Sequence, residues 1–144
     1  MLGPIHHVGY LALDLEAAIR DFTNTFGLRV VRRFDRPQFS LLGAYLGTKE
    51  ASRIEVFTFT DGHLLDRRLA GSSLLLDHVA FEVDDIDATA LAMRQAGVRF
   101  SGPDFRDEVQ EPIKLGHIRH LWTFPETSGG QSIQILQLTS EERS

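Results

Sequence analysis

Along this chain, segments in which apolar and polar residues alternate with the period of a strand are followed by segments with the period of a helix. In residues 5–12 (IHHVGYLA) and 76–83 (LDHVAFEV) they alternate from one residue to the next, which is typical of half-buried strands. Each stretch leads through an aspartate into a segment of helical period that ends at a glycine. The pattern therefore predicts a strand followed by a helix at two places in the chain.

The helix boundaries follow from capping chemistry. Asp14 in the first stretch and Asp84 or Asp85 in the second have side-chain oxygens that suit the start of a helix. Gly27 and Gly97 suit the left-handed conformation that ends one. The apolar stripes expected to face a sheet are Ile19, Phe22 and Phe26 in the first helix and Ile86, Ala90 and Met93 in the second.

The two halves of the sequence share one plan. When His7 is aligned with His78, Asp14 meets Asp85, and after one gap Gly27 meets Gly97. Three more strand-like segments follow each glycine: LRVVRRF, FSLLGAYLG and RIEVFTFT in the first half, and VRF, HIRHLWTF and QSIQILQL in the second. We therefore predict an α+β protein built from two tandem βαβββ modules.

The modules are expected at residues 1–60 and 74–139. Residues 61–73 form a polar linker with room for a short helical turn, and residues 140–144 form a tail. The second module carries its extra length in residues 101–116 (SGPDFRDEVQEPIKLG), a charged segment with two prolines. We regard this segment as a candidate lid.

Composition and charge narrow the classes of partner. A chain of 144 residues with 42% hydrophobic residues is long enough for one full core or for two small modules that share one. Its net charge of −5 argues against nucleic-acid or anionic-membrane partners and leaves only short basic clusters such as RVVRRF as contact points. No apolar run reaches the ~20 residues that span a bilayer and no signal-peptide pattern is present, so we expect a cytoplasmic location.

Two histidines are candidate metal ligands. Because the sequence has no cysteine, any metal ion must be held by His, Asp, Glu or amide oxygen. Strand alternation places His7 and His78 at equivalent positions on the face away from the helices. His6, whose counterpart is Asp77, falls on the opposite face, and we expect it at the surface or at an edge.

The last strand of each module carries one polar residue among apolar ones. In the first module it is Glu55, and the equivalent position in the second is Gln134. An isolated strand would favour a solvent-facing Glu55 beside Arg53, but the repeat favours convergence of Glu55 and Gln134 with the two histidines if the modules pack with their open faces together. Such a set of nitrogen and oxygen donors suits one divalent ion of Zn, Ni, Co, Mn or Fe.

This doubled plan, with HHVGYLALDLEAAIRDF and DHVAFEVDDIDATALAMRQAGV, resembles the vicinal oxygen chelate superfamily of glyoxalase I, bleomycin-resistance proteins and extradiol dioxygenases. The second half is most similar to methylmalonyl-CoA epimerase. The resemblance implies a glyoxalase-like fold in which two modules form a cupped, incomplete barrel around one metal. It also implies that the metal ligands are His7, Glu55, His78 and Gln134.

The chain departs from these relatives in ways that bear on its chemistry. They usually present a proton-moving glutamate in the last strand of the second module, where this chain has Gln134, and an amide takes no proton at neutral pH. The carboxylate stands instead on the first module as Glu55. The middle strand FSLLGAYLG offers no second base near Gly43 and Ala44, so a two-base epimerisation is not expected.

A second group of polar residues lies in GHIRHLWTFPETSGG. His117, Arg119 and His120 are candidates to bind a carboxylate or phosphate of the substrate, with Trp122 as an apolar wall. The alternative is that they are solvated strand residues beside a core tryptophan.

The function that the resemblance implies is a metal-dependent lyase or isomerase of glyoxalase or epimerase type. The metal would chelate a carbonyl or thioester oxygen and stabilise an enolate while Glu55 moves a proton. The alternatives are a non-catalytic protein that binds a small molecule, such as a drug or metabolite, and an Fe(II) dioxygenase with two histidines and one carboxylate. We expect a small-molecule partner and a homodimer, with no nucleic acid and no membrane.

Overall fold

The computed structural model describes residues 1–48 and 51–139, with the backbone alone for Ser52. It divides into two compact units. The N-terminal unit is His7–Asp77, and the C-terminal unit combines Met1–His6 with the chain from His78 onward. The division falls inside two strands, β1 (Ile5–Ala12) and β5 (Leu74–Glu82). The predicted tail, residues 140–144, lies outside the described residues, and the predicted module limits stay a prediction.

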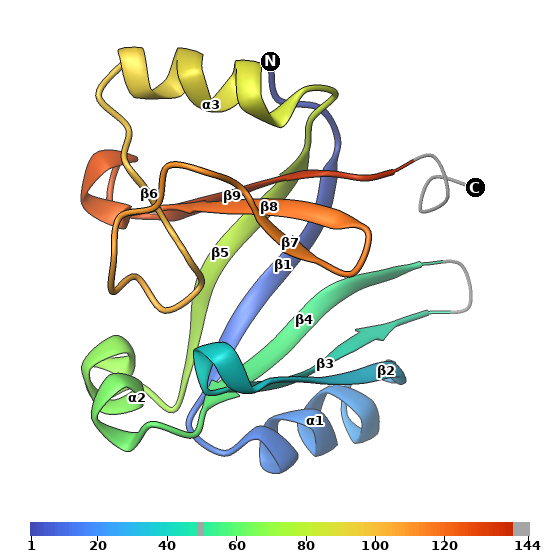
Figure 1. Cartoon of the computed structure of the whole chain (residues 1–144). Coiled ribbons are helices and arrows are strands. Elements are labelled where there is room, and N and C mark those ends of the chain that lie inside the picture. Colours follow the sequence, from blue (N-terminus) through green and yellow to red (C-terminus); the bar gives the residue numbers. More distant parts are fainter. Residues whose placement is uncertain (49–50, 140–144) are drawn as a thin grey trace. The chain divides into compact units, whose positions relative to one another are not determined.

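The N-terminal unit has the predicted β-α-β-β-β order (Figure 1). After β1 come α1 (Leu15–Asn24), β2 (Arg29–Arg36), a one-turn helix (Pro37–Phe39), β3 (Leu41–Gly47), β4 (Ser52–Phe59) and α2 (Gly62–Leu69). In space the strands run β2-β3-β4-β1, with β1 parallel to β4 and the other pairs antiparallel. A full helix, α2, therefore stands where the sequence indicated only a helical turn.

The two helices of this unit pack on opposite faces of its sheet. Asp14 begins α1, because its carboxylate accepts a hydrogen bond of 3.0 Å from the Ala17 amide. The core under α1 contains Ala12, Ala18, Ile19, Ala44, Leu46 and Val56, and the core that includes α2 contains Leu11, Leu41, Phe57, Phe59, Leu64, Leu65 and Leu69. Phe26 lies beyond the end of α1 and is 70% exposed, so its expected place in the buried stripe was wrong.

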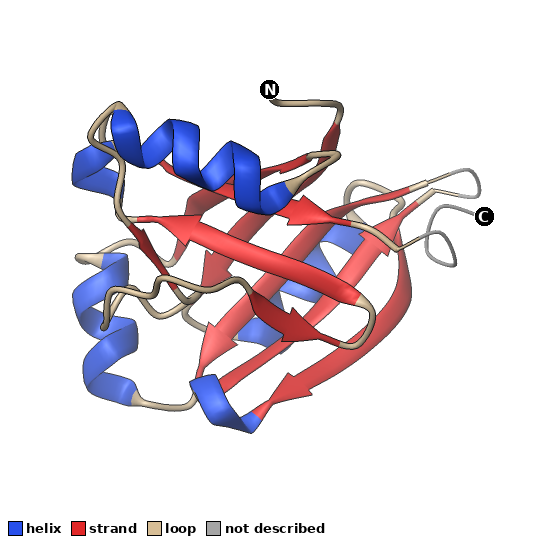
Figure 2. Cartoon of the chain, turned by 45° about the horizontal axis from the view of Figure 1, so that its top comes forward, coloured by secondary structure: helices blue, strands red, loops and turns tan. Residues whose placement is uncertain are grey.

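The C-terminal unit follows the same order with one additional short strand, β7, between the second and third strands of the repeat (Figure 2). After β5 come α3 (Ile86–Gln95), β6 (Phe100–Ser101), β7 (Ile113–Leu115), β8 (Ile118–Thr123), a one-turn helix (Pro125–Thr127) and β9 (Ser132–Gln137). Strand β9 is parallel to β5 and antiparallel to β8, which also pairs with β6 and β7. Asp85 rather than Asp84 caps α3 by accepting a 3.0 Å bond from the Ala88 amide.

The strand registers confirm the internal repeat. In the N-terminal unit Glu55 pairs with Gly9, two residues after His7. In the C-terminal unit Gln134 pairs with Ala80, two residues after His78. The predicted fold class, α+β with two βαβββ modules of the glyoxalase type, is thus confirmed. Within the described ranges no helix is long and apolar enough to cross a lipid bilayer.

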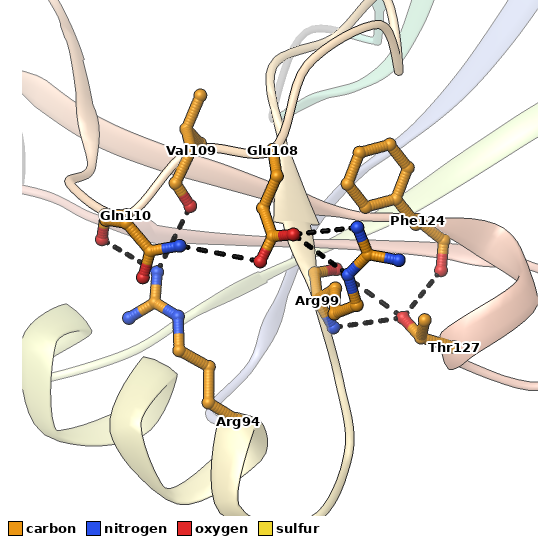
Figure 3. A network of polar contacts seen from close by, with 7 residues as sticks. All are labelled: Arg94, Arg99, Glu108, Val109, Gln110, Phe124 and Thr127. Atoms are coloured by element: carbon orange, nitrogen blue, oxygen red, sulfur yellow. Dashed lines mark hydrogen bonds and ion pairs between the residues drawn. The ribbon is translucent and has the colours of Figure 1, made fainter.

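Hydrogen bonds from Arg94 and Arg99 hold the middle of the candidate lid, residues 101–116, in place (Figure 3). Arg94 of α3 donates hydrogen bonds to the carbonyl oxygens of Val109 (3.3 Å) and Gln110 (2.7 Å). Arg99 donates two to Glu108, at 2.9 and 2.7 Å, and this bonding holds the Glu108 pKa below its usual 4.5. A lid movement of this segment would have to break these contacts.

Removing the Glu108 charge should loosen the segment without unfolding the protein. We expect Glu108→Gln to speed hydrogen exchange of the Val109 amide, which donates to the Phe100 carbonyl at 2.9 Å, by about two- to fivefold at neutral pH, because exposed ion pairs are weak. Since the folded pKa is lowered, the wild-type contact should be present above pH 4.5 and lost as the pH falls through that folded pKa. Amide exchange read by NMR measures this, and an equal effect of Asp107→Asn would contradict it.

Candidate metal and active site

His7 and Glu55 form a buried pair on adjacent strands of the N-terminal unit. The His7 Nε2 atom lies 3.4 Å from Glu55 Oε2, and the two residues are 0% and 9% exposed. The alternative of a solvent-facing Glu55 beside Arg53 is therefore wrong. Burying most of a carboxylate is costly unless charged or hydrogen-bonding groups face it. The buried position of Glu55 beside His7, on the sheet face opposite α1, thus marks it as a functional candidate.

Tyr45 belongs to this cluster, and the sequence analysis missed it. It lies opposite Glu55 in the β3–β4 ladder and donates a hydrogen bond to its carboxylate. Burial, and then the neighbouring Glu55 charge and hydrogen bond, raise the Tyr45 pKa well above 10, so the hydroxyl stays protonated at neutral pH. Its ring also meets the His7 ring edge-on, with the centroids 5.7 Å apart. Tyr45 thereby holds both members of the pair in place.

The position of a second base on the middle strand is filled by an aromatic ring. Gly43 lies two residues before Tyr45 on β3, and Phe34 of β2 is its partner in the ladder. A Cβ atom on Gly43 would come within 2.4 Å of Phe34 Cζ and 2.9 Å of the Val56 carbonyl oxygen. A side chain at this position would have to displace the Phe34 ring, so the absence of a base here has a packing cause.

His78 and Gln134 are the buried polar residues at the equivalent places of the C-terminal unit, each 2% exposed. Gln134 Nε2 lies 2.7 Å from His120 Nδ1, so the amide donates and the imidazole nitrogen accepts. This bond turns the Gln134 Oε1 atom away from His120. Among the described residues that buried oxygen has no hydrogen-bond partner, which is expensive for a polar atom and fits an oxygen ligand for a metal ion.

The other sequence candidates divide between the two faces of β8. His120 is buried and its ring stacks on Trp122 at 5.4 Å and 14°. Arg119 points to the helix side, where it makes two 3.0 Å bonds with Asp87 of α3 that raise its pKa. His117 is exposed at the turn before β8. The structure thus places His120 and Trp122 beside Gln134, and the substrate-binding roles of all four stay predictions.

Each unit therefore presents one buried imidazole and one buried oxygen donor at matching positions. His7, Glu55 and His78 each offer one ligand atom of a type that divalent transition metals bind. The repeated units and these donors define an α+β protein of the glyoxalase class. The chain belongs to the glyoxalase/bleomycin resistance protein/dioxygenase superfamily, whose model matches residues 6–114.

Curated relatives are enzymes of two kinds. The chain is 30% identical over 107 residues to ethylmalonyl-CoA/methylmalonyl-CoA epimerase from Cereibacter sphaeroides, covering 71% of this chain and 77% of that one. It is 29% identical over 93 residues to lactoylglutathione lyase from Haemophilus influenzae, covering 62% and 67%. Methylmalonyl-CoA epimerase from Mycobacterium tuberculosis shares the fold, with a TM-score of 0.80 at 20% identity over 97% of this chain and 91% of that one.

Proposed function

We propose that this protein is a metal-dependent lyase or isomerase that moves a proton next to a carbonyl or thioester group of a small molecule. The observation that carries the proposal is the buried His7–Glu55 pair with Tyr45 bonded to the carboxylate. The names of the epimerase and lyase relatives support the reaction class, and the epimerase relative's name supports a thioester substrate.

The proposed metal site uses the four donors expected from the sequence. His7, His78 and Glu55 would bind one divalent ion of Zn, Ni, Co, Mn or Fe, and Gln134 would add its amide oxygen. The buried Gln134 Oε1 atom supports this assignment, because a metal ion would satisfy an acceptor that lacks a partner among the described residues. His120 would then act by holding the Gln134 amide in the right orientation.

The proton would be moved by Glu55. When bound, the metal supplies a Lewis acid that draws electron density toward the substrate oxygen. The Glu55 carboxylate accepts the proton from the carbon next to that carbonyl and returns it in the second half of the reaction. The Tyr45 hydroxyl steadies the carboxylate while it changes between its charged and neutral forms. Because Phe34 fills the space over Gly43, we propose a reaction with one base.

The test begins with the purified full chain. Elemental analysis should give about one transition-metal ion per chain, and a thioester or ketone substrate should take up deuterium from heavy water in its presence. A metal-free protein that still binds small molecules would favour the non-catalytic alternative, whereas oxygen consumption with Fe(II) would favour a dioxygenase. The predicted homodimer and cytoplasmic location stay predictions.

A further inference from the structure

Strand β2 carries an unusual concentration of positive charge for an acidic protein. Its eight residues, RVVRRFDR, include four arginines and one aspartate, while the whole chain has a net charge of −5. The ladder between β2 and β3 shifts register between Val30 and Arg32. Beyond this irregularity, Arg32, Phe34 and Arg36 share one face of β2, and Arg33 lies on the other.

The arginines on the two faces of β2 have different partners. Arg33 lies on the α1 side, where its guanidinium makes a two-bond ion pair with Glu16 of α1 at 2.6 and 3.0 Å. Arg32 and Arg36 lie on the face opposite α1, over the rings of Tyr45 and Phe34 at 5.2 and 5.6 Å. Within residues 1–48 and 51–139 neither of these two makes an ion pair with a carboxylate.

Stacking on a ring orders a guanidinium and leaves most of its five N–H groups for other partners. Arg36 uses one of them in a 3.4 Å hydrogen bond to the Asp35 carbonyl oxygen. An arginine over an aromatic face still directs its N–H groups outward in a planar fork that matches carboxylate and phosphate oxygens. The centroids of the Tyr45 and Phe34 rings are 5.2 Å apart and the rings are tilted by 42°, so the two arginines lie over neighbouring aromatic rings. Their charges also reach the Tyr45 hydroxyl, whose pKa they lower although burial and Glu55 raise it by more. The arginines therefore border the His7–Glu55–Tyr45 cluster.

We propose that Arg32 and Arg36 form a subsite for an anionic oxygen group of the substrate, a phosphate or a carboxylate. The subsite would fix the charged end of the molecule at β2 while its carbonyl group lies at Glu55. The inference rests on the proposed function only for the place of that carbonyl. The substrate class is thus narrowed to carbonyl or thioester compounds with a negatively charged end.

The test uses inorganic diphosphate and succinate as probes of the full chain, with affinities measured by calorimetry at low salt. We expect at least one probe to bind, and Arg32→Gln and Arg36→Gln each to weaken it about five- to tenfold, because each removes charge-assisted hydrogen bonds. Arg33→Gln removes the same charge from the same strand and should change binding less than twofold. Tighter binding of diphosphate would assign a phosphate group, and tighter binding of succinate a carboxylate.

Two outcomes would overturn the subsite. One is no binding of either probe at millimolar concentration, and the other is an equal loss of binding in Arg33→Gln, which would mean that the strand attracts anions only through its net charge. Neither measurement needs metal or turnover. If the protein exchanges substrate protons but binds neither probe, the subsite is rejected and the proposed function stands. If it binds the probes but holds no metal ion, the proposed function is rejected and the subsite stands.

Discussion

Glu55→Gln should abolish proton exchange while leaving the fold intact. The amide has the size of the carboxylate but accepts no proton at neutral pH, and a positioned general base is worth about a hundredfold or more in rate. We therefore expect deuterium uptake from heavy water to fall at least about a hundredfold. Tyr45 can still donate to the amide oxygen, so circular dichroism and the melting temperature should change little.

Tyr45→Phe is the matched control for this result. It keeps the ring that meets His7 and removes only the hydroxyl that bonds to Glu55. Exchange should fall by about tenfold or less, since one supporting hydrogen bond is lost and the base remains. If Glu55→Gln exchanges protons as fast as the wild type, another group moves the proton and Glu55 is not the base.

His7→Ala and His78→Ala should each empty the metal site. Both imidazoles are buried, at 0% and 2% exposure, and each would supply one of the nitrogen ligands. Losing the contact that only orients a ligand typically costs about ten- to a hundredfold in metal affinity, so losing a ligand itself should cost at least that much. Equilibrium dialysis followed by elemental analysis measures the change.

His6→Ala is the control for the two histidine variants. His6 neighbours His7 in sequence but its side chain leaves β1 on the other face, and the residue is only half-buried. Metal affinity in this variant should stay within about twofold of the wild type. An equal loss in all three variants would show that the face assignment of β1 does not decide which imidazole binds.

The repeat and its polar positions could be predicted because they depend on local periodicity. Alternation alone separates His6 from His7, and the shared plan of the two halves predicts that Glu55 and Gln134 are equivalent, as the strand registers confirm. The helix start at Asp14 follows from side-chain chemistry within a few residues, whereas for α3 that chemistry allowed Asp84 or Asp85 and the structure has Asp85. None of this needs knowledge of distant contacts.

The surroundings of the candidate ligands could not be predicted, because they depend on which strands pair and in what register. In the sequence Tyr45 is one apolar-patterned strand residue among others, and only the register of the β3–β4 ladder places it opposite Glu55. The Phe34 ring reaches Gly43 through the β2–β3 ladder, which contains an irregularity that no local pattern marks. His120 finds Gln134 in the same way, through the pairing of β8 with β9.

The passage of the unit boundary through β1 has a consequence for how the chain reaches its folded state. Residues 1–6 are synthesised before the N-terminal unit, yet Gly3 and Pro4 exchange backbone hydrogen bonds with Glu82, at 2.8 and 2.9 Å. A side chain at Gly3 would meet the Glu82 carbonyl at 2.7 Å, so this contact needs glycine. During synthesis, residues 1–6 can form these hydrogen bonds only after β5 has been made. A fragment that ends at Asp77 would lack Glu82, their partner.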